Sequence, residues 1–299
     1  MSALRTGMAA AALLLCSLLL GLPRLEAQAP AAQPSTSVQV PAGAVERVYK
    51  QASGADLKLY VFKPLDLKPS ERKPAVIYFA GGGWTNLRVD AGFPLASRLA
   101  SLGIVGISAT YRVRSQHNST PYDSVADAKS AIRWVREHAA DLQIDPSRIA
   151  GVGDSAGAHV LLTAAVVDAF DEPSENRAIS SKPSALFLTA AVVTTVPDGA
   201  TALTPQQRTL LDFLGPRTME VSPLHHLARN LPPTVIYHGK NDPLMPYVAV
   251  EEFCAKARTL GNACDLVGFD DTAHNVARAR QAEVDAGLLG FLKKLAYLQ

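Results

Sequence analysis

The sequence has few cysteines, few aromatic residues and almost no excess charge. Its 299 residues include 3 cysteines and 2 tryptophans, and 29 basic residues nearly balance 27 acidic ones. The net charge of +2 and the lack of a long basic run argue against a nucleic-acid partner. No internal repeat is visible. The length and the 48% hydrophobic content instead suit one medium-sized domain with a sizeable core.

The first residues of the chain are interpreted as an export signal. Arg5 supplies a positive charge, and an apolar stretch follows it over residues 8–22. This stretch is short for a membrane span, which needs about 20 residues, so a cleaved signal is favoured over a stable membrane anchor. We predict a signal peptide over residues 1–27, a linker over 28–43 and a catalytic domain over 44–299. The mature protein is expected to be secreted or periplasmic.

Residues 153–157 read Gly-Asp-Ser-Ala-Gly and lie between an apolar run and an apolar helix. The pattern Gly-x-Ser-x-Gly between a strand and a helix is typical of a nucleophile elbow, a sharp turn that exposes the serine hydroxyl. Glycines are needed at Gly153 and Gly157 because a Cβ there would collide with the neighbouring strand or helix. A loop that is merely rich in glycine and serine is the alternative. We predict that Ser155 is a nucleophile.

A serine that attacks an acyl group needs a base and a carboxylate that orients the base. In one widespread arrangement the carboxylate and then the histidine follow the serine along the chain, each on a loop after a strand. Asp242 lies just after one β-rich run, and His274 lies just after the next. Asp270 and Asp271 are closer to His274 in sequence and compete with Asp242 for the orienting role. We predict the catalytic set Ser155, Asp242 and His274.

A run of three glycines follows an apolar strand at residues 75–80. Consecutive glycines let backbone N–H groups approach a substrate without side chains between them. We predict that the amides of Gly82 and Gly83, with that of Ala156, face the oxyanion that develops in the reaction. Removing one such donor typically costs on the order of 10²–10³ in rate. A flexible turn is the alternative for the glycine run taken alone.

Together these motifs resemble the hormone-sensitive-lipase-like branch of the α/β-hydrolases, and within it the secreted acetyl, xylan and feruloyl esterases of bacteria. The resemblance covers residues 45–298. It implies a serine carboxylesterase that acts through an acyl-enzyme intermediate without a cofactor or metal. One residue departs from the family pattern: Ala80 stands where the family usually has a histidine that buttresses the oxyanion loop. Its absence bears on the stiffness of the loop more than on the mechanism.

Strand-like and helix-like segments alternate along the chain. This alternation predicts an α/β fold with a mostly parallel sheet of about eight strands, covered by helices on both faces and preceded by an antiparallel hairpin. The predicted strands are 45–50, 57–63, 75–80, 104–110, 148–153, 185–192, 233–238 and 264–269, and the predicted helices are 91–102, 123–140, 156–168, 247–261 and 277–297. No large cap is expected, and possible lid material is limited to residues 168–182 and 196–214.

Loss of the signal peptide would remove Cys16 and leave Cys254 and Cys264 in an oxidising compartment. The two cysteines flank a single helix–turn–strand connection. We predict a disulfide between them, and two buried thiols are the alternative.

Other polar residues near these motifs are interpreted as structural. We expect His159 to pack in the interior, Asp154 to form a salt bridge or a cap, and Asp127 and Arg133 to pair at the surface or between elements. The neighbouring histidines at 225 and 226 lack a carboxylate or cysteine at metal-ligand spacing, so no metal site is predicted. Tyr111 and Arg112 either orient substrate or pair with an acidic loop.

Little chain is available to cover the site. A shallow site suits a short acyl group on a bulky alcohol, such as acetyl or feruloyl groups on a polysaccharide, or a small-molecule ester. Two other activities share this order of catalytic residues: those of a prolyl-oligopeptidase-type peptidase and of an arylformamidase. A catalytically inactive binding homologue is an alternative of a different class.

Overall fold

The structure is a computed structural model that describes residues 38–196 and 204–298. The predicted signal peptide and residues 28–37 of the predicted linker lie outside these residues. No helix within the described ranges is both long enough and apolar enough to span a membrane.

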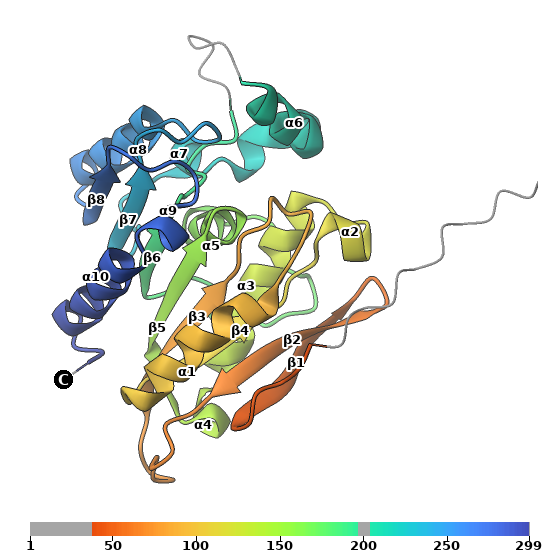
Figure 1. The fold of residues 1–299 in the computed structure, drawn as a ribbon. Coiled ribbons are helices and arrows are strands. Elements are labelled where there is room, and N and C mark those ends of the chain that lie inside the picture. The colour runs from red at the N-terminus through yellow and green to blue at the C-terminus, as the bar shows by residue number, and fades with distance from the viewer. Residues whose placement is uncertain (1–37, 197–203, 299) are drawn as a thin grey trace, which may run out of the picture. The chain divides into compact units, whose positions relative to one another are not determined.

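The core of the fold is an eight-stranded sheet with the strand order β1-β2-β4-β3-β5-β6-β7-β8 (Figure 1). β2 runs antiparallel to both β1 and β4, and every other neighbouring pair is parallel. This confirms the predicted mostly parallel sheet with an antiparallel hairpin at its start. The strands are β1 (Ala44–Ala52), β2 (Ala55–Phe62), β3 (Lys73–Phe79), β4 (Val105–Ala109), β5 (Ile144–Asp154), β6 (Ala185–Thr189), β7 (Thr234–Gly239) and β8 (Cys264–Phe269).

Helices cover both faces of the sheet. α1 and α10 pack on one face, and α3, α5 and α8 pack on the other. The helical elements are η1 (Val89–Gly92), α1 (Phe93–Ser101), α2 (Arg114–His117), α3 (Pro121–Glu137), α4 (Ala139–Leu142), α5 (Ala156–Val166), α6 (Pro205–Leu214), η2 (Gly215–Val221), α7 (Pro223–His226), α8 (Tyr247–Thr259), α9 (Val276–Ala279) and α10 (Gln281–Lys294). The predicted helix over 277–297 is therefore two helices, which meet at Arg280.

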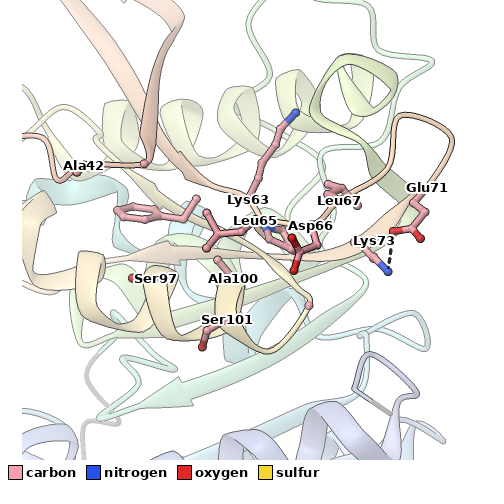
Figure 2. A pocket seen from close by; sticks show the side chains of 14 residues that line it. Ala42, Lys63, Leu65, Asp66, Leu67, Glu71, Lys73, Ser97, Ala100 and Ser101 are labelled. Atoms are coloured by element: carbon pink, nitrogen blue, oxygen red, sulfur yellow. Dashed lines mark ion pairs between the residues drawn. The ribbon is translucent and has the colours of Figure 1, made fainter.

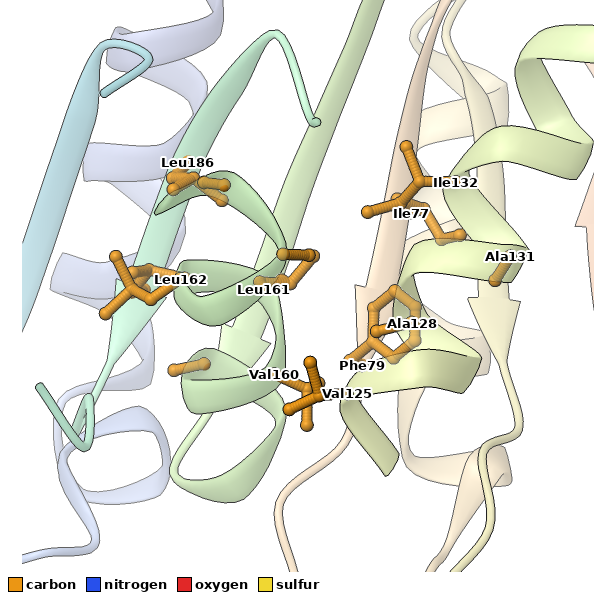
Figure 3. Packing of buried hydrophobic residues seen from close by; sticks show 14 of the residues in the cluster. Ile77, Phe79, Val125, Ala128, Ala131, Ile132, Val160, Leu161, Leu162 and Leu186 are labelled. Carbon is orange, nitrogen blue, oxygen red and sulfur yellow. The ribbon is translucent and has the colours of Figure 1, made fainter. Parts of the chain in front are cut away.

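The central strands are buried on both faces because successive side chains point to opposite sides of a strand. On β3, Val76 belongs to the cluster under α1 and α10, whereas Ile77 belongs to the cluster under α3 and α5. Figure 3 shows this second cluster, to which Ile77 of β3, Ile132 of α3 and Leu161 of α5 all belong. All three side chains are fully buried. This packing fixes α5, and with it the turn that carries Ser155, on the middle of the sheet.

Residues 168–182 are bound to α3. Lys129 Nζ lies 2.9 Å from Asp171 Oδ2, and Arg133 pairs with both Asp171 and Glu175. Farther along α3, Arg136 donates to the backbone carbonyls of this segment. The interpretation of residues 168–182 as lid material is therefore wrong, because these bonds hold the segment along the helix. The prediction that Arg133 pairs between elements is confirmed.

The two cysteines of the described chain are joined. Cys254 of α8 and Cys264 at the start of β8 form a disulfide, with their Cα atoms 5.2 Å apart. Both are buried. The bond connects α8 to the strand that leads to the loop of His274.

Candidate active site

Ser155 stands at the turn between β5 and α5. Its backbone has φ 50° and ψ −115°, a conformation that residues with a side chain rarely adopt and that is found where strain serves a function. A Cβ at Gly153 would lie 2.7 Å from the amide nitrogen of Ala158, and one at Gly157 would lie 2.0 Å from the carbonyl oxygen of Phe79. The turn therefore requires both glycines, as predicted.

Three predicted residues from distant parts of the chain form a line of hydrogen bonds. Ser155 Oγ lies 2.7 Å from His274 Nε2, and His274 Nδ1 lies 2.7 Å from Asp242 Oδ2. Asp242 is fully buried at its side chain, while the His274 side chain is 21% exposed. Because the carboxylate can only accept, Nδ1 of His274 carries the proton. Its Nε2 is then free to accept the Ser155 hydroxyl proton.

The environment of Asp242 favours its ionised form. Oδ1 accepts hydrogen bonds from the amides of Leu244 and Met245, at 2.8 and 3.0 Å. Burial by itself raises the pKa of Asp242, but hydrogen bonds from His238 and His274 outweigh that effect and hold the pKa below its usual range. The carboxylate can therefore stabilise a positive charge on His274.

His238 is a site residue to which the sequence pattern assigned no role. Its Nε2 lies 2.9 Å from the carbonyl oxygen of Met245 and 3.1 Å from Asp242 Oδ2. Since both neighbours are acceptors, Nε2 carries the proton and donates to them. Nδ1 is buried and finds no partner within the described ranges. A histidine four positions before a predicted catalytic aspartate, at the end of a strand, was the available signal.

The two competing aspartates are engaged with cations. Asp270 Oδ1 lies 2.6 Å from Lys240 Nζ, and Asp271 pairs with Arg280. The hydrogen bond to His274 is made by Asp242, so the structure favours Asp242 over both for the orienting role.

The glycine run forms a loop that touches the nucleophile turn. A Cβ at Gly81 would lie 3.2 Å from the Cβ of Ser155. Gly82 and Gly83 have φ of +143° and +61°, and the carbonyl of Gly82 accepts the amides of Thr85 and Asn86. Within the part of the chain that the structure describes, no backbone acceptor pairs with the amides of Gly82 and Gly83. These two donors are available to a substrate.

Ala156 supplies the third predicted donor. It is the first residue of α5, and the first N–H groups of a helix have no partner inside the helix. Its amide directly follows Ser155, so all three predicted donors lie on the two segments that meet at the nucleophile.

The loop over residues 80–84 is held without a histidine at position 80. The Tyr111 hydroxyl donates to the carbonyl of Ala80 at 2.7 Å, and the amide of Arg114 donates to the carbonyl of Trp84 at 2.9 Å. The Trp84 ring is 1% exposed and meets His159 edge to face, with ring centroids 4.9 Å apart. His159 is fully buried, which confirms its interpretation as a packed residue.

The remaining polar candidates have structural partners. Within residues 38–196 and 204–298, Asp154 forms neither a salt bridge nor a cap. Its Oδ1 accepts the Thr189 hydroxyl at 2.6 Å, and burial raises its pKa. Arg112 binds Asp127 of α3, with both Nε and Nη2 at 2.8 Å from the carboxylate, and its Nη2 also lies 3.8 Å from Glu172 Oε1 of the acidic segment 168–182, as the pairing alternative predicted. The pairing of Asp127 between elements is confirmed, since its buried carboxylate also lies 2.7 Å from Lys50 Nζ of β1. No cluster of metal-ligating side chains occurs among the residues with described positions.

A cavity of about 600 Å³ lies at the end of the sheet where β3 begins, opposite the end that carries the active site (Figure 2). Lys63, Asp66, Glu71 and Lys73 line it, and Lys73 Nζ is 3.1 Å from Glu71 Oε2. Lys73 begins β3, whereas the oxyanion loop follows the last residue of the same strand. The length of β3 therefore separates this cavity from Ser155.

Comparisons with known proteins give consistent results. The family model BD-FAE matches residues 61–256. The chain is 31% identical to the probable carboxylic ester hydrolase LipM of Mycobacterium tuberculosis, over 76% of this chain and 58% of LipM. It is 30% identical to the esterase LipQ of the same organism, over 70% of this chain and 52% of LipQ. The chain thus spans about half the length of the curated relatives it matches.

Solved structures cover more of the chain. The apo form of Thermogutta terrifontis esterase 2 is 37% identical, with a TM-score of 0.80, over 87% of this chain and 97% of that one. That esterase has also been solved with propionate bound, with butyrate bound and phosphorylated by paraoxon. The chain belongs to the BD-FAE family, within the hormone-sensitive-lipase-like esterase branch of the α/β-hydrolases, and it has the α/β-hydrolase fold.

Proposed function

We propose that this protein is a serine carboxylesterase that hydrolyses short-acyl or aryl esters, such as acetyl or feruloyl esters, including those on polysaccharides. The observation that carries the proposal is the line of hydrogen bonds from Ser155 through His274 to Asp242. The named activities of LipM and LipQ support ester hydrolysis. The propionate and butyrate complexes of Thermogutta terrifontis esterase 2 support a short acyl group.

The first half of the proposed reaction transfers the acyl group to Ser155. Nε2 of His274 removes the hydroxyl proton as Oγ attacks the ester carbonyl, and Asp242 stabilises the imidazolium that results. The amides of Gly82, Gly83 and Ala156 receive the negative charge of the tetrahedral intermediate. His274 then gives its proton to the departing alcohol, which leaves an acyl-enzyme.

The second half repeats these steps with water in place of the alcohol. Nε2 of His274 removes a proton from a water molecule that attacks the acyl-enzyme carbonyl. The same amides receive the charge, and His274 returns the proton to Ser155 Oγ as the carboxylic acid departs. Each step uses side chains or amides that the structure brings to one edge of the sheet.

Substitution of the nucleophile tests the mechanism. Ser155→Ala should lower kcat for p-nitrophenyl acetate on the order of 10⁶-fold and abolish labelling by a fluorophosphonate probe. Ser222→Ala is a matched control, because Ser222 also bonds to a histidine, with its Oγ 2.8 Å from His225 Nδ1, but lies outside the nucleophile turn. The control should keep labelling and hydrolysis. Substantial turnover by folded Ser155→Ala protein would refute the assignment.

The ester class is tested separately with one purified sample. Initial rates are measured on p-nitrophenyl esters from acetyl to dodecanoyl, on methyl ferulate and on acetylated xylan. We expect kcat/KM to be highest for the shortest acyl chains or for the feruloyl ester. A maximum at dodecanoyl, or hydrolysis confined to peptide anilides or formylkynurenine, would contradict the proposed substrate class.

We further propose that the protein acts after export, in the periplasm or outside the cell. The apolar stretch of residues 8–22 supports a cleaved signal, and the disulfide between Cys254 and Cys264 is suited to an oxidising compartment. The intact mass of protein recovered from the culture medium or periplasm tests this. A mass that retains residues 1–27, or recovery from the cytoplasm alone, would count against it.

A further inference from the structure

We propose that Tyr111 is a positioning residue that sets the shape of the oxyanion loop, residues 80–84, and thereby the rate of ester hydrolysis. The inference rests on the proposed function. Tyr111 lies two residues beyond the end of β4 and is fully buried. Its hydroxyl donates to the carbonyl oxygen of Ala80 across 2.7 Å. This bond links two segments that are 31 residues apart in sequence.

The Ala80 carbonyl has no ready substitute for this donor. Ala80 is 3% exposed, so bulk water does not reach its carbonyl oxygen in the folded chain. Burial also raises the pKa of Tyr111, so the phenol keeps its proton at every pH where the enzyme would work. Removing the hydroxyl would leave a buried acceptor unpaired, and the loop would have to move to satisfy it.

The bond acts next to the reacting atoms. The Ala80 carbonyl belongs to the peptide unit that joins Ala80 to Gly81, and Gly81 packs directly against the Ser155 turn. Fixing this carbonyl fixes the direction in which the following residues leave β3. The amides of Gly82 and Gly83 come next, so a rotation at Ala80 would move both donors away from the oxyanion.

The segment that carries Tyr111, residues 111–115, also holds the other end of the oxyanion loop. The amide of Arg114 donates to the carbonyl of Trp84 at 2.9 Å, and the amide of Ser115 donates to the carbonyl of Thr85 at 3.0 Å. Residues 111–115 therefore contact the loop on both sides of the glycine pair. Between these contacts lie Gly81, Gly82 and Gly83, none of which has a side chain that could anchor it, and the last two carry the donors in question.

Removal of the hydroxyl tests the inference. Tyr111→Phe should lower kcat/KM for p-nitrophenyl acetate by about 10–100-fold, mostly through kcat, because misplaced donors bind the transition state less well than the substrate. The affinity for a trifluoromethyl ketone inhibitor, whose adduct carries the same oxyanion, should fall by a similar factor. Replacement of Tyr111 by 4-aminophenylalanine keeps a donor on the ring and should restore most of both losses.

Tyr49→Phe is the matched control. The Tyr49 hydroxyl donates to the carbonyl of Thr110 at 2.8 Å, so this change deletes the same kind of bond one residue away from Tyr111 and outside the oxyanion loop. Both variants should melt at a lower temperature than the wild type. Only Tyr111→Phe should lose kcat and inhibitor affinity when all proteins are assayed well below their melting temperatures.

Three results would overturn the inference. The first is a Tyr111→Phe protein with wild-type kcat and wild-type ketone affinity. The second is an equal loss of kcat in Tyr49→Phe, which would indicate general destabilisation. The third is a failure of 4-aminophenylalanine to restore activity. In each of these cases the wild type would still be labelled by the fluorophosphonate, whereas an unlabelled wild type would refute the proposed function and this inference with it.

Discussion

At the scale of single residues, Asp242 uses its two carboxylate oxygens for different contacts. Oδ1 accepts the amides of Leu244 and Met245, which fixes the plane of the carboxylate on its own loop. Oδ2 lies within 3.1 Å of ring nitrogens of both His274 and His238. A neutral amide cannot accept at both positions, because one of its two ends is a donor. The site therefore requires a carboxylate rather than a group of the same shape.

Substitution of this carboxylate is expected to be costly. Asp242→Asn should lower kcat by up to about 10⁴-fold, since an amide N–H facing Nδ1 favours the wrong tautomer of His274. Asp271→Asn is the control, because Asp271 pairs with Arg280 instead. Steady-state kcat on p-nitrophenyl acetate decides between them. A large loss in Asp271→Asn with near-native kcat in Asp242→Asn would reassign the orienting carboxylate.

The sequence could identify the residues that lie in motifs, but not those that act through the backbone. Ser155, Asp242 and His274 were predictable because each has a fixed relation to the end of a strand. The contacts of Tyr111 and His238 were not, because both residues donate to main-chain carbonyls, of Ala80 and Met245. Every residue has such a carbonyl, so residue type and spacing do not reveal which one a side chain will meet.

At the scale of elements, the strands were the most predictable part. β4 and β6 are buried at every position, and a short, mostly apolar run is typical of a strand in a parallel sheet. The segment 168–182 was misjudged because its position depends on ion pairs with α3, such as that of Asp171 with Lys129, 42 residues away in sequence. Helices of four residues, such as α2 and α7, are too short to show a helical period.

The disulfide acts at this scale, because it ties α8 to β8. Replacing both cysteines, Cys254→Ala with Cys264→Ala, should destabilise the fold by about 2–3 kcal/mol. For a domain of this size, that lowers the melting temperature by roughly 5–10 °C. The value of kcat should change little, because the bond lies outside the line from Ser155 to Asp242. Thermal melts and kcat of the double variant are compared with the wild type; an unchanged melting temperature would contradict the prediction.

At the scale of the whole molecule, buried titratable groups set the response to acid. His159 is fully buried in α5, and its Nε2 donates to the carbonyl of Val221 at 2.8 Å. Burial lowers the pKa of His159 to about 4, although the hydrogen bond to Val221 opposes this. In an unfolded chain the pKa of a histidine is about 6.5. Below that pH the unfolded chain gains a proton that the folded chain does not, so stability falls as the pH falls.

Two aspartates of the site respond to acid in opposite directions. The pKa of Asp242 is held below its usual range, so the stability that Asp242 provides is present above the unfolded pKa of about 3.9 and is lost as the pH falls further. The pKa of Asp154 is raised by burial, so the cost of its ionised form decreases on acidification. The effect of Asp242 therefore acts below about pH 3.9, and the effect of Asp154 acts above it. Burial also lowers the pKa values of His117 and His225, so the contribution of His159 is isolated by comparing the wild type with a variant that lacks the His159 imidazole.

The comparison of melting temperatures between wild type and variant gives a measurable expectation. With pKa values of about 4 in the folded chain and about 6.5 in the unfolded chain, His159 should cost about 2 kcal/mol between pH 6.5 and 4.5, or roughly 4–8 °C in melting temperature. His159→Gln keeps an N–H donor for the Val221 carbonyl but cannot take up a proton, so its melting temperature should fall less over this interval. His226→Gln is the control, because the hydrogen bond from His226 Nε2 to the carbonyl of Met219 is exposed to solvent. If the melting temperatures of His159→Gln and the wild type fell by the same amount between these two pH values, the buried histidine would not be the source of the acid sensitivity.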